Sequence, residues 1–153
     1  WLNDQLHLGI VFSTPMENEN MTTNKDGRSI SSISTLKDAV SFPIAFFPET
    51  NDLKINGIET YVTDQQTRVF IQYAAADGKS LFLKIEPFSG NSALGVDISS
   101  TETIDSPIGT IYMWTDGEYS YAMAISAESI INISSSASVE ELAAYCQTLC
   151  FLN

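Results

Sequence analysis

The chain has little of what most catalytic and metal centres use. Among its 153 residues there is one histidine, His7, and there are two cysteines. A nucleophile–base pair or a zinc site would need further imidazole or thiol groups. The glycine-rich phosphate-binding patterns, the Gly-x-Ser-x-Gly turn of serine hydrolases and the EF-hand calcium loop are also missing from the sequence. We therefore expect no metal ion, no cofactor and no catalytic residue.

The two cysteines, Cys146 and Cys150, are four residues apart near the end of the chain. On a helix this spacing places both on one face, with their Cβ atoms farther apart than the ~3.8 Å that a disulfide needs. We expect two buried thiols.

Basic residues are scarce. There are 7 lysines and arginines against 19 acidic residues, which gives a formal net charge of −12. Such a surface repels nucleic-acid phosphates and anionic lipid headgroups, so we expect neither nucleic acid nor a membrane surface as partner. No apolar run approaches the ~18 residues of a membrane-spanning helix. Any signal peptide or anchor would lie outside this sequence, which opens at Trp1.

What is present suits a globular body, because 44% of the residues are hydrophobic. We expect one domain over residues 35–153, preceded by an N-terminal segment over residues 1–34. In that segment apolar residues alternate from Leu6 to Phe12, and residues 13–29 form a polar linker or loop. The alternation predicts a strand that pairs with a sheet edge, either its own or that of a second copy in a homodimer.

The domain itself predicts an α+β fold: a curved, mostly antiparallel sheet with a helix packed on one face. Ser34 is expected to cap a short helix that reaches Val40, before the first main strand. A second helix begins at the capping box Ser138-Val-Glu-Glu and ends near Cys150. The expected strands outside the hairpin described next cover residues 58–62, 68–75, 80–86, an edge strand at 96–104, and a short final strand at 130–133.

The stretch from Thr110 to Ser126 reads as a β-hairpin with a two-residue turn at Asp116-Gly117. The resulting pairing puts Trp114 opposite Tyr119 and Tyr112 opposite Tyr121, so these aromatic side chains share one face with Met123. We call Tyr112, Trp114, Tyr119 and Tyr121 the aromatic row. The row can be part of the core or a stacking platform for a sugar or peptide. The opposite face, made by Ile111, Met113, Ala122 and Ala124, is smooth enough for a helix to lie against.

Paired carboxylates are the remaining route to catalysis. Acidic residues lie in or beside the expected strands, and two of them could approach at the distances that glycosidases use. Most of them occupy turn or edge positions, where acids are ordinary surface residues. A small carboxylate hydrolase would draw its two acids from this set: Asp97, Glu102, Asp105, Asp116 and Glu118.

One resemblance covers roughly Thr35 to Leu149. It rests on the order of short motifs along the chain: Leu36-Lys-Asp-Ala, Phe42-Pro-Ile, Pro48, the strands after it, the hairpin stretch with Ile111, Trp114-Thr-Asp-Gly and Tyr119-Ser-Tyr, and Ser138-Val-Glu-Glu-Leu. This order resembles an uncharacterised domain family found outside the membrane in Gram-positive bacteria. The chain departs from it after Pro48, where the family often has a second proline and a glycine.

Members of that family occur in anti-sigma-type regulators, envelope lipoproteins and secreted proteins. The resemblance implies a non-enzymatic extracytoplasmic domain, the sensory or regulatory part of such a regulator, and it carries over no catalytic residue. The alternative is a secreted or lipid-anchored module that binds a glycan or peptide through the aromatic row. The partner is in either case a protein or a glycan that the sequence does not name.

Overall fold

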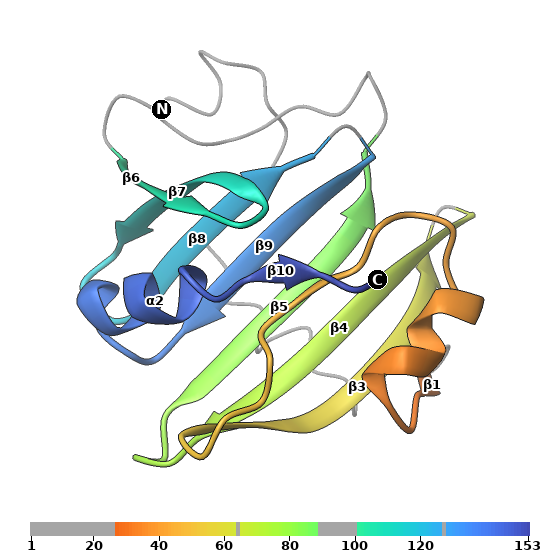
Figure 1. The fold of residues 1–153 in the computed structure, drawn as a ribbon, viewed down its shortest axis with the longest axis horizontal. Helices are drawn as coiled ribbons and strands as arrows, with labels where there is room; N and C mark the ends of the chain where they lie inside the picture. The colour runs from red at the N-terminus through yellow and green to blue at the C-terminus, as the bar shows by residue number, and fades with distance from the viewer. Residues whose placement is uncertain (1–26, 64, 89–100, 127) are drawn as a thin grey trace.

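The computed structural model describes residues 27–63, 65–88, 101–126 and 128–153. An eight-stranded antiparallel sheet dominates this part of the chain, and short helices and a two-stranded sheet lie over one of its faces (Figure 1). The predicted α+β class with a mostly antiparallel sheet is therefore confirmed.

The sheet joins the three-stranded meander β3-β4-β5 to the four-stranded meander β6-β7-β8-β9, because β9 pairs with β5. Its order is β1-β3-β4-β5-β9-β8-β7-β6, and every neighbouring pair is antiparallel. The two outer edges are thus β1 and β6. The strands cover β1 (Arg28–Ser29), β3 (Leu53–Thr63), β4 (Gln66–Ala75), β5 (Ser80–Pro87), β6 (Glu102–Ser106), β7 (Gly109–Thr115), β8 (Ser120–Ile125) and β9 (Ser129–Ser135).

Strand β9 differs most from its prediction. The sequence suggests a short final strand, whereas β9 is seven residues long, lies between β5 and β8, and is buried along its whole length. The sequence lacks the continuous apolar run of a fully buried strand, because Asn132 interrupts the isoleucines and serines stand at both ends. They are buried because they satisfy backbone groups: the hydroxyl of Ser135 donates to the carbonyl of Ser80 at 2.8 Å and accepts from the N–H of Ala137 at 2.9 Å.

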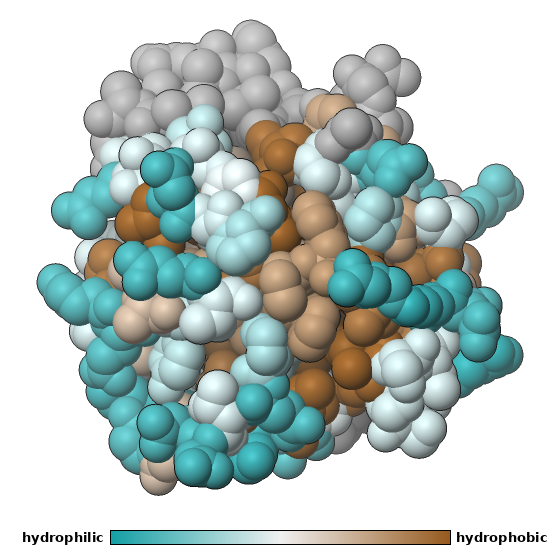
Figure 2. Space-filling view, in the orientation of Figure 1, coloured by the Kyte–Doolittle hydropathy of each residue, from teal (hydrophilic) through white to brown (hydrophobic). Residues whose placement is uncertain are grey.

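A covering layer packs on one face of the sheet. It consists of the 3-10 helix η3 (Ile33–Asp38), β2 (Ala45–Phe46), α2 (Val139–Cys146) and β10 (Cys150–Phe151), with β10 paired to β2. Figure 2 shows this side of the molecule, with hydrophilic residues along much of its periphery and hydrophobic ones gathered nearer the middle. Helix α2 contacts β7 and β8. The predicted smooth surface for a helix is confirmed, because Ile111, Met113, Ala122 and Ala124 are buried in one cluster with Leu142.

Both helices differ from their predicted bounds. The first is a 3-10 helix whose N-cap is Ser32, so the prediction of a cap at Ser34 is wrong. Helix α2 begins as predicted, since the Ser138 hydroxyl accepts from the N–H of Glu141 at 3.2 Å. It ends at Cys146, not near Cys150, because Cys150 pairs with Phe46 in the two-stranded sheet.

The two thiols are free, as predicted, and they differ in accessibility. Cys146 is fully buried and Cys150 is half-buried. Burial raises the pKa of Cys146 to about 12 and also raises the pKa of Cys150. We expect Cys146 to resist a thiol reagent in the native protein at pH 8, because the thiolate is the reactive form. Both thiols should react at once after unfolding, and a rapid native reaction of Cys150→Ser protein would contradict this expectation.

Candidate functional site

The hairpin that carries the aromatic row has a different register from the one predicted. Trp114 pairs with Tyr121, and Tyr112 pairs with Met123. The connection is therefore the four residues 116–119, and the predicted two-residue turn is wrong. A shift by two residues leaves each side chain on its expected face, since faces alternate with period two. Tyr119 drops out of the paired strand.

The side chain of Asp116 explains the longer turn. Its Oδ1 accepts hydrogen bonds from the N–H groups of Glu118 and Tyr119, each at 2.8 Å, and its Oδ2 accepts one from the Tyr121 hydroxyl at 2.9 Å. Only Gly117, with φ +95°, has a positive φ in this turn, whereas a two-residue type I′ turn needs two such residues. These hydrogen bonds, led by the one from Tyr119, lower the pKa of Asp116 below its ordinary value of 3.8.

We expect Asp116 to make the hairpin sensitive to acid. Because its pKa is lower in the folded state, its stabilising contribution is present above the unfolded value of 3.8 and is lost as the pH falls through the folded pKa. Against Asp116→Asn, the native protein should be more stable by about 0.5 kcal/mol at pH 7, a small effect because the group is exposed. Thermal melts at pH 7 and pH 3 test this, and a difference that does not shrink at pH 3 would contradict it.

The aromatic row lies on the face of the sheet opposite the covering layer. The rings of Trp114 and Tyr121 stack with centroids 5.7 Å apart and planes 21° apart. Tyr121 is only 4% exposed, and Tyr112 and Trp114 pack against the fully buried Met123. Tyr112, Trp114 and Tyr119 are half-buried, so they keep some accessible surface. The aromatic row is thus partly buried in a second, smaller core cluster and partly accessible at its surface. Its use for binding stays a prediction.

Two of the carboxylates considered for hydrolysis, Glu102 and Asp105, do not face each other. Glu102 pairs with Met113 and Asp105 pairs with Thr110, which places the two acids on opposite faces of the edge strand β6. The Asp116 carboxylate accepts hydrogen bonds within its own turn, and Asp97 lies outside the described residues. Nor does this part of the chain hold a group of three or more His, Cys, Asp or Glu side chains able to bind a metal ion.

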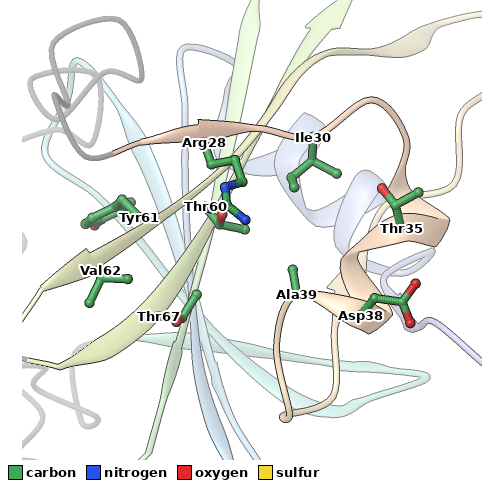
Figure 3. Close-up of a pocket in the computed structure, with 9 residues that line it drawn as sticks. All are labelled: Arg28, Ile30, Thr35, Asp38, Ala39, Thr60, Tyr61, Val62 and Thr67. Carbon is green, nitrogen blue, oxygen red and sulfur yellow. The ribbon is translucent and has the colours of Figure 1, made fainter.

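A groove that the sequence analysis did not predict runs between η3 and the end of the β3–β4 hairpin (Figure 3). It is made of two adjoining cavities of about 440 and 580 Å³ that share Asp38, Ala39 and Thr67. We call it the η3 groove. The first cavity adds Arg28, Ile30, Thr35, Thr60, Tyr61 and Val62, and the second adds Val40, Ser41, Phe42, Gln65, Gln66 and Pro87.

Little in the sequence marks the η3 groove. Its residues come from four separate stretches, and their proximity depends on where η3 lies against the sheet. The turn at its rim also has an unusual backbone, because Gln65 adopts φ 65°, in the left-handed region that favours glycine or asparagine. Arg28 falls in the predicted polar linker or loop, yet it lies in β1, paired with Thr60 of β3.

Two further predictions concern a membrane-spanning helix and the N-terminal segment. No helix among the described residues is long and apolar enough to cross a membrane. The predicted pairing of Leu6–Phe12 with a sheet edge lies outside the described residues, so the homodimer that it would create stays a prediction.

Comparisons with family models, with curated proteins and with solved structures find no match to this chain. The arguments below therefore rest on its own residues and on the resemblance given above.

Proposed function

We propose that this chain is a non-enzymatic extracytoplasmic domain that forms the sensory or regulatory part of an anti-sigma-type envelope protein. One observation carries the proposal beyond motif order: the segments that give the resemblance contribute to a single core. Leu36, Ile44, Ile111 and Leu142, which come from four of these segments, are all buried in one cluster. Motifs spread over more than a hundred residues thus act as one folded unit.

The geometry of the polar groups also supports binding in place of catalysis. The acids of β6 face away from each other, and Asp116 holds a turn. The η3 groove is lined by hydroxyl groups, amide groups and charged groups of both signs, which can recognise a ligand through hydrogen bonds.

A deletion in the native protein tests the proposal. Removing residues 35–149 while keeping the rest of the gene should change the transcriptional response of the cognate sigma factor to envelope stress. A matched variant with Ala144→Gln, an exposed position on α2, should respond as the native protein does. An unchanged response after the deletion would overturn the proposal, as would a hydrolytic activity that is lost in Asp97→Asn, Glu102→Gln or Asp105→Asn.

A second candidate is a glycan- or peptide-binding module, favoured by the stacked Trp114 and Tyr121 rings. A sugar or peptide would stack on the half-buried face of Trp114. We expect Trp114→Ala to remove any signal on a glycan or peptide array, while Tyr61→Ala, on another aromatic pair of the sheet, keeps it. An array signal that is the same for native protein and Trp114→Ala would count against this module.

A further inference from the structure

The face of the sheet opposite the covering layer is buried, although none of the described helices and strands lies over it (Figure 1). The covering layer contributes its apolar side chains to the cluster on the other face, with Leu36 from η3 and Leu142 from α2. We call the face that carries the aromatic row the second face. Its inner side chains are almost inaccessible, since Met123 is 0%, Phe70 3% and Ile130 3% exposed. Side chains on an open sheet face stand with their tips in solvent, so these values require a cover.

A buried amide lies in the middle of the second face. Asn132 of β9 is paired with Lys84 of β5 on one side and with Met123 of β8 on the other. Among the described residues, the Oδ1 atom of Asn132 is the one buried side-chain oxygen or nitrogen without a hydrogen-bond partner. Buried polar atoms almost always have a partner, so we expect the cover of this face to bring a donor to Oδ1.

The cover belongs to this chain. The side chains of the second face are buried within a single chain, so neither a second copy nor another protein is needed to cover them. Two long stretches lie outside the described residues, 1–26 and 89–100. Residues 89–100 join β5 to β6, and β6 lies on the opposite side of β5 from β4, which carries Phe70. Residues 1–26 lead into β1, on the same side of β5 as Phe70, so the N-terminal segment is the better placed of the two to cover this ring.

The N-terminal segment also has the pattern and the length for this role. Apolar residues alternate in it, so one side of an extended segment carries Leu6, Leu8, Ile10 and Phe12. Residues 13–27 can span roughly 50 Å when extended, at ~3.3 Å per residue. The eight strands extend over only about 34 Å across the sheet, at ~4.8 Å per strand. From β1, the alternating residues can therefore reach any strand of the second face.

We propose that residues 6–12 pack on the second face over β4 and β5, with their apolar side against the ring of Phe70 and a donor of the segment on Asn132 Oδ1. The sheet then has a layer on each face. The covering layer closes one face, and the start of the chain closes the other.

Nuclear Overhauser effects in the full chain test this contact directly, because they are seen only between protons that lie close together. With the methyl groups of Ile and Leu and the rings of Phe labelled, the Phe70 ring should show effects to methyl groups of Leu6, Leu8 or Ile10. The proposal is overturned if the ring shows none to residues 6–12, whether residues 89–100 take their place or the segment pairs with a sheet edge.

A matched pair of variants tests the side of the segment that is buried. Ile10→Asp places a charge on the apolar side, and Val11→Asp places one on the opposite side. We expect Ile10→Asp to lower the melting temperature by about 5 °C or more, because the charge would be buried without a partner, and Val11→Asp to lower it by less than about 2 °C. Equal losses would overturn the proposal. The nuclear Overhauser measurement needs no variant, so it decides even if Ile10→Asp does not fold.

Discussion

Replacing Leu142 with alanine is expected to lower the free energy of unfolding by about 2–5 kcal/mol. Leu142 is fully buried and is the residue through which α2 enters the main core, beside Cys146 and Leu149. The shorter side chain would leave a cavity between the helix and the β7–β8 surface, where the small side chains of Ala122 and Ala124 cannot move to fill it. Urea unfolding followed by circular dichroism measures the loss.

The control for this prediction lies on the same helix. Ala144 is exposed, so Ala144→Gln should change the free energy of unfolding by less than about 0.5 kcal/mol. Equal losses for Leu142→Ala and Ala144→Gln would show that helix propensity, and not packing on the sheet, holds α2 in place.

Removing the hydroxyl group of Tyr73 is expected to have the second largest effect. Tyr73 is fully buried in β4, and its hydroxyl accepts a hydrogen bond from the N–H of Phe47 at 2.8 Å. The two rings also meet edge to face with centroids 5.5 Å apart. Tyr73→Phe would keep this ring contact but leave the N–H unpaired, which costs about 1–3 kcal/mol. Burial raises the pKa of the phenol, so the effect should be constant over the ordinary pH range.

Tyr112→Phe is the matched control, because the Tyr112 hydroxyl makes no hydrogen bond among the described residues and the side chain is half-buried. Its free energy of unfolding should stay within about 0.5 kcal/mol of the native value. If Tyr73→Phe were as stable as Tyr112→Phe, the hydrogen bond from Phe47 would not hold the segment just after β2 on the sheet.

The parts of the fold that the sequence predicts are those with strong local signals. The alternation in β4 and β5, the capping box at Ser138 and the small-residue face of the hairpin each predict their element, because the cause lies within a few residues. The position of β9 in the sheet does not follow from a local signal. Its place between β5 and β8 depends on pairs as distant in sequence as Leu81 and Ser135, and serines that bond to the backbone obscure its burial.

The candidate sites likewise contain features that follow from a local sequence pattern and features that do not. The shared face of Tyr112, Trp114 and Tyr121 follows from the alternation of side chains along a strand. It is therefore predicted correctly although the predicted register is wrong by two residues. The four-residue turn does not follow from the Asp-Gly pair, because the Asp116 side chain accepts hydrogen bonds from the backbone and a rule for two-residue turns does not include these bonds. The η3 groove has no sequence signal at all, since Arg28, Asp38 and Thr60 come to line one cavity only after η3 packs beside the sheet.

The location of this domain in the native protein tests the central claim most directly. Intact cells of the host would be treated with a protease that does not cross the membrane, and fragments of the full-length protein would be identified by mass spectrometry. We predict cleavage within residues 27–153 together with a protected cytoplasmic extension that co-purifies with a sigma factor. A domain that stays uncleaved until the cells are lysed would contradict the account.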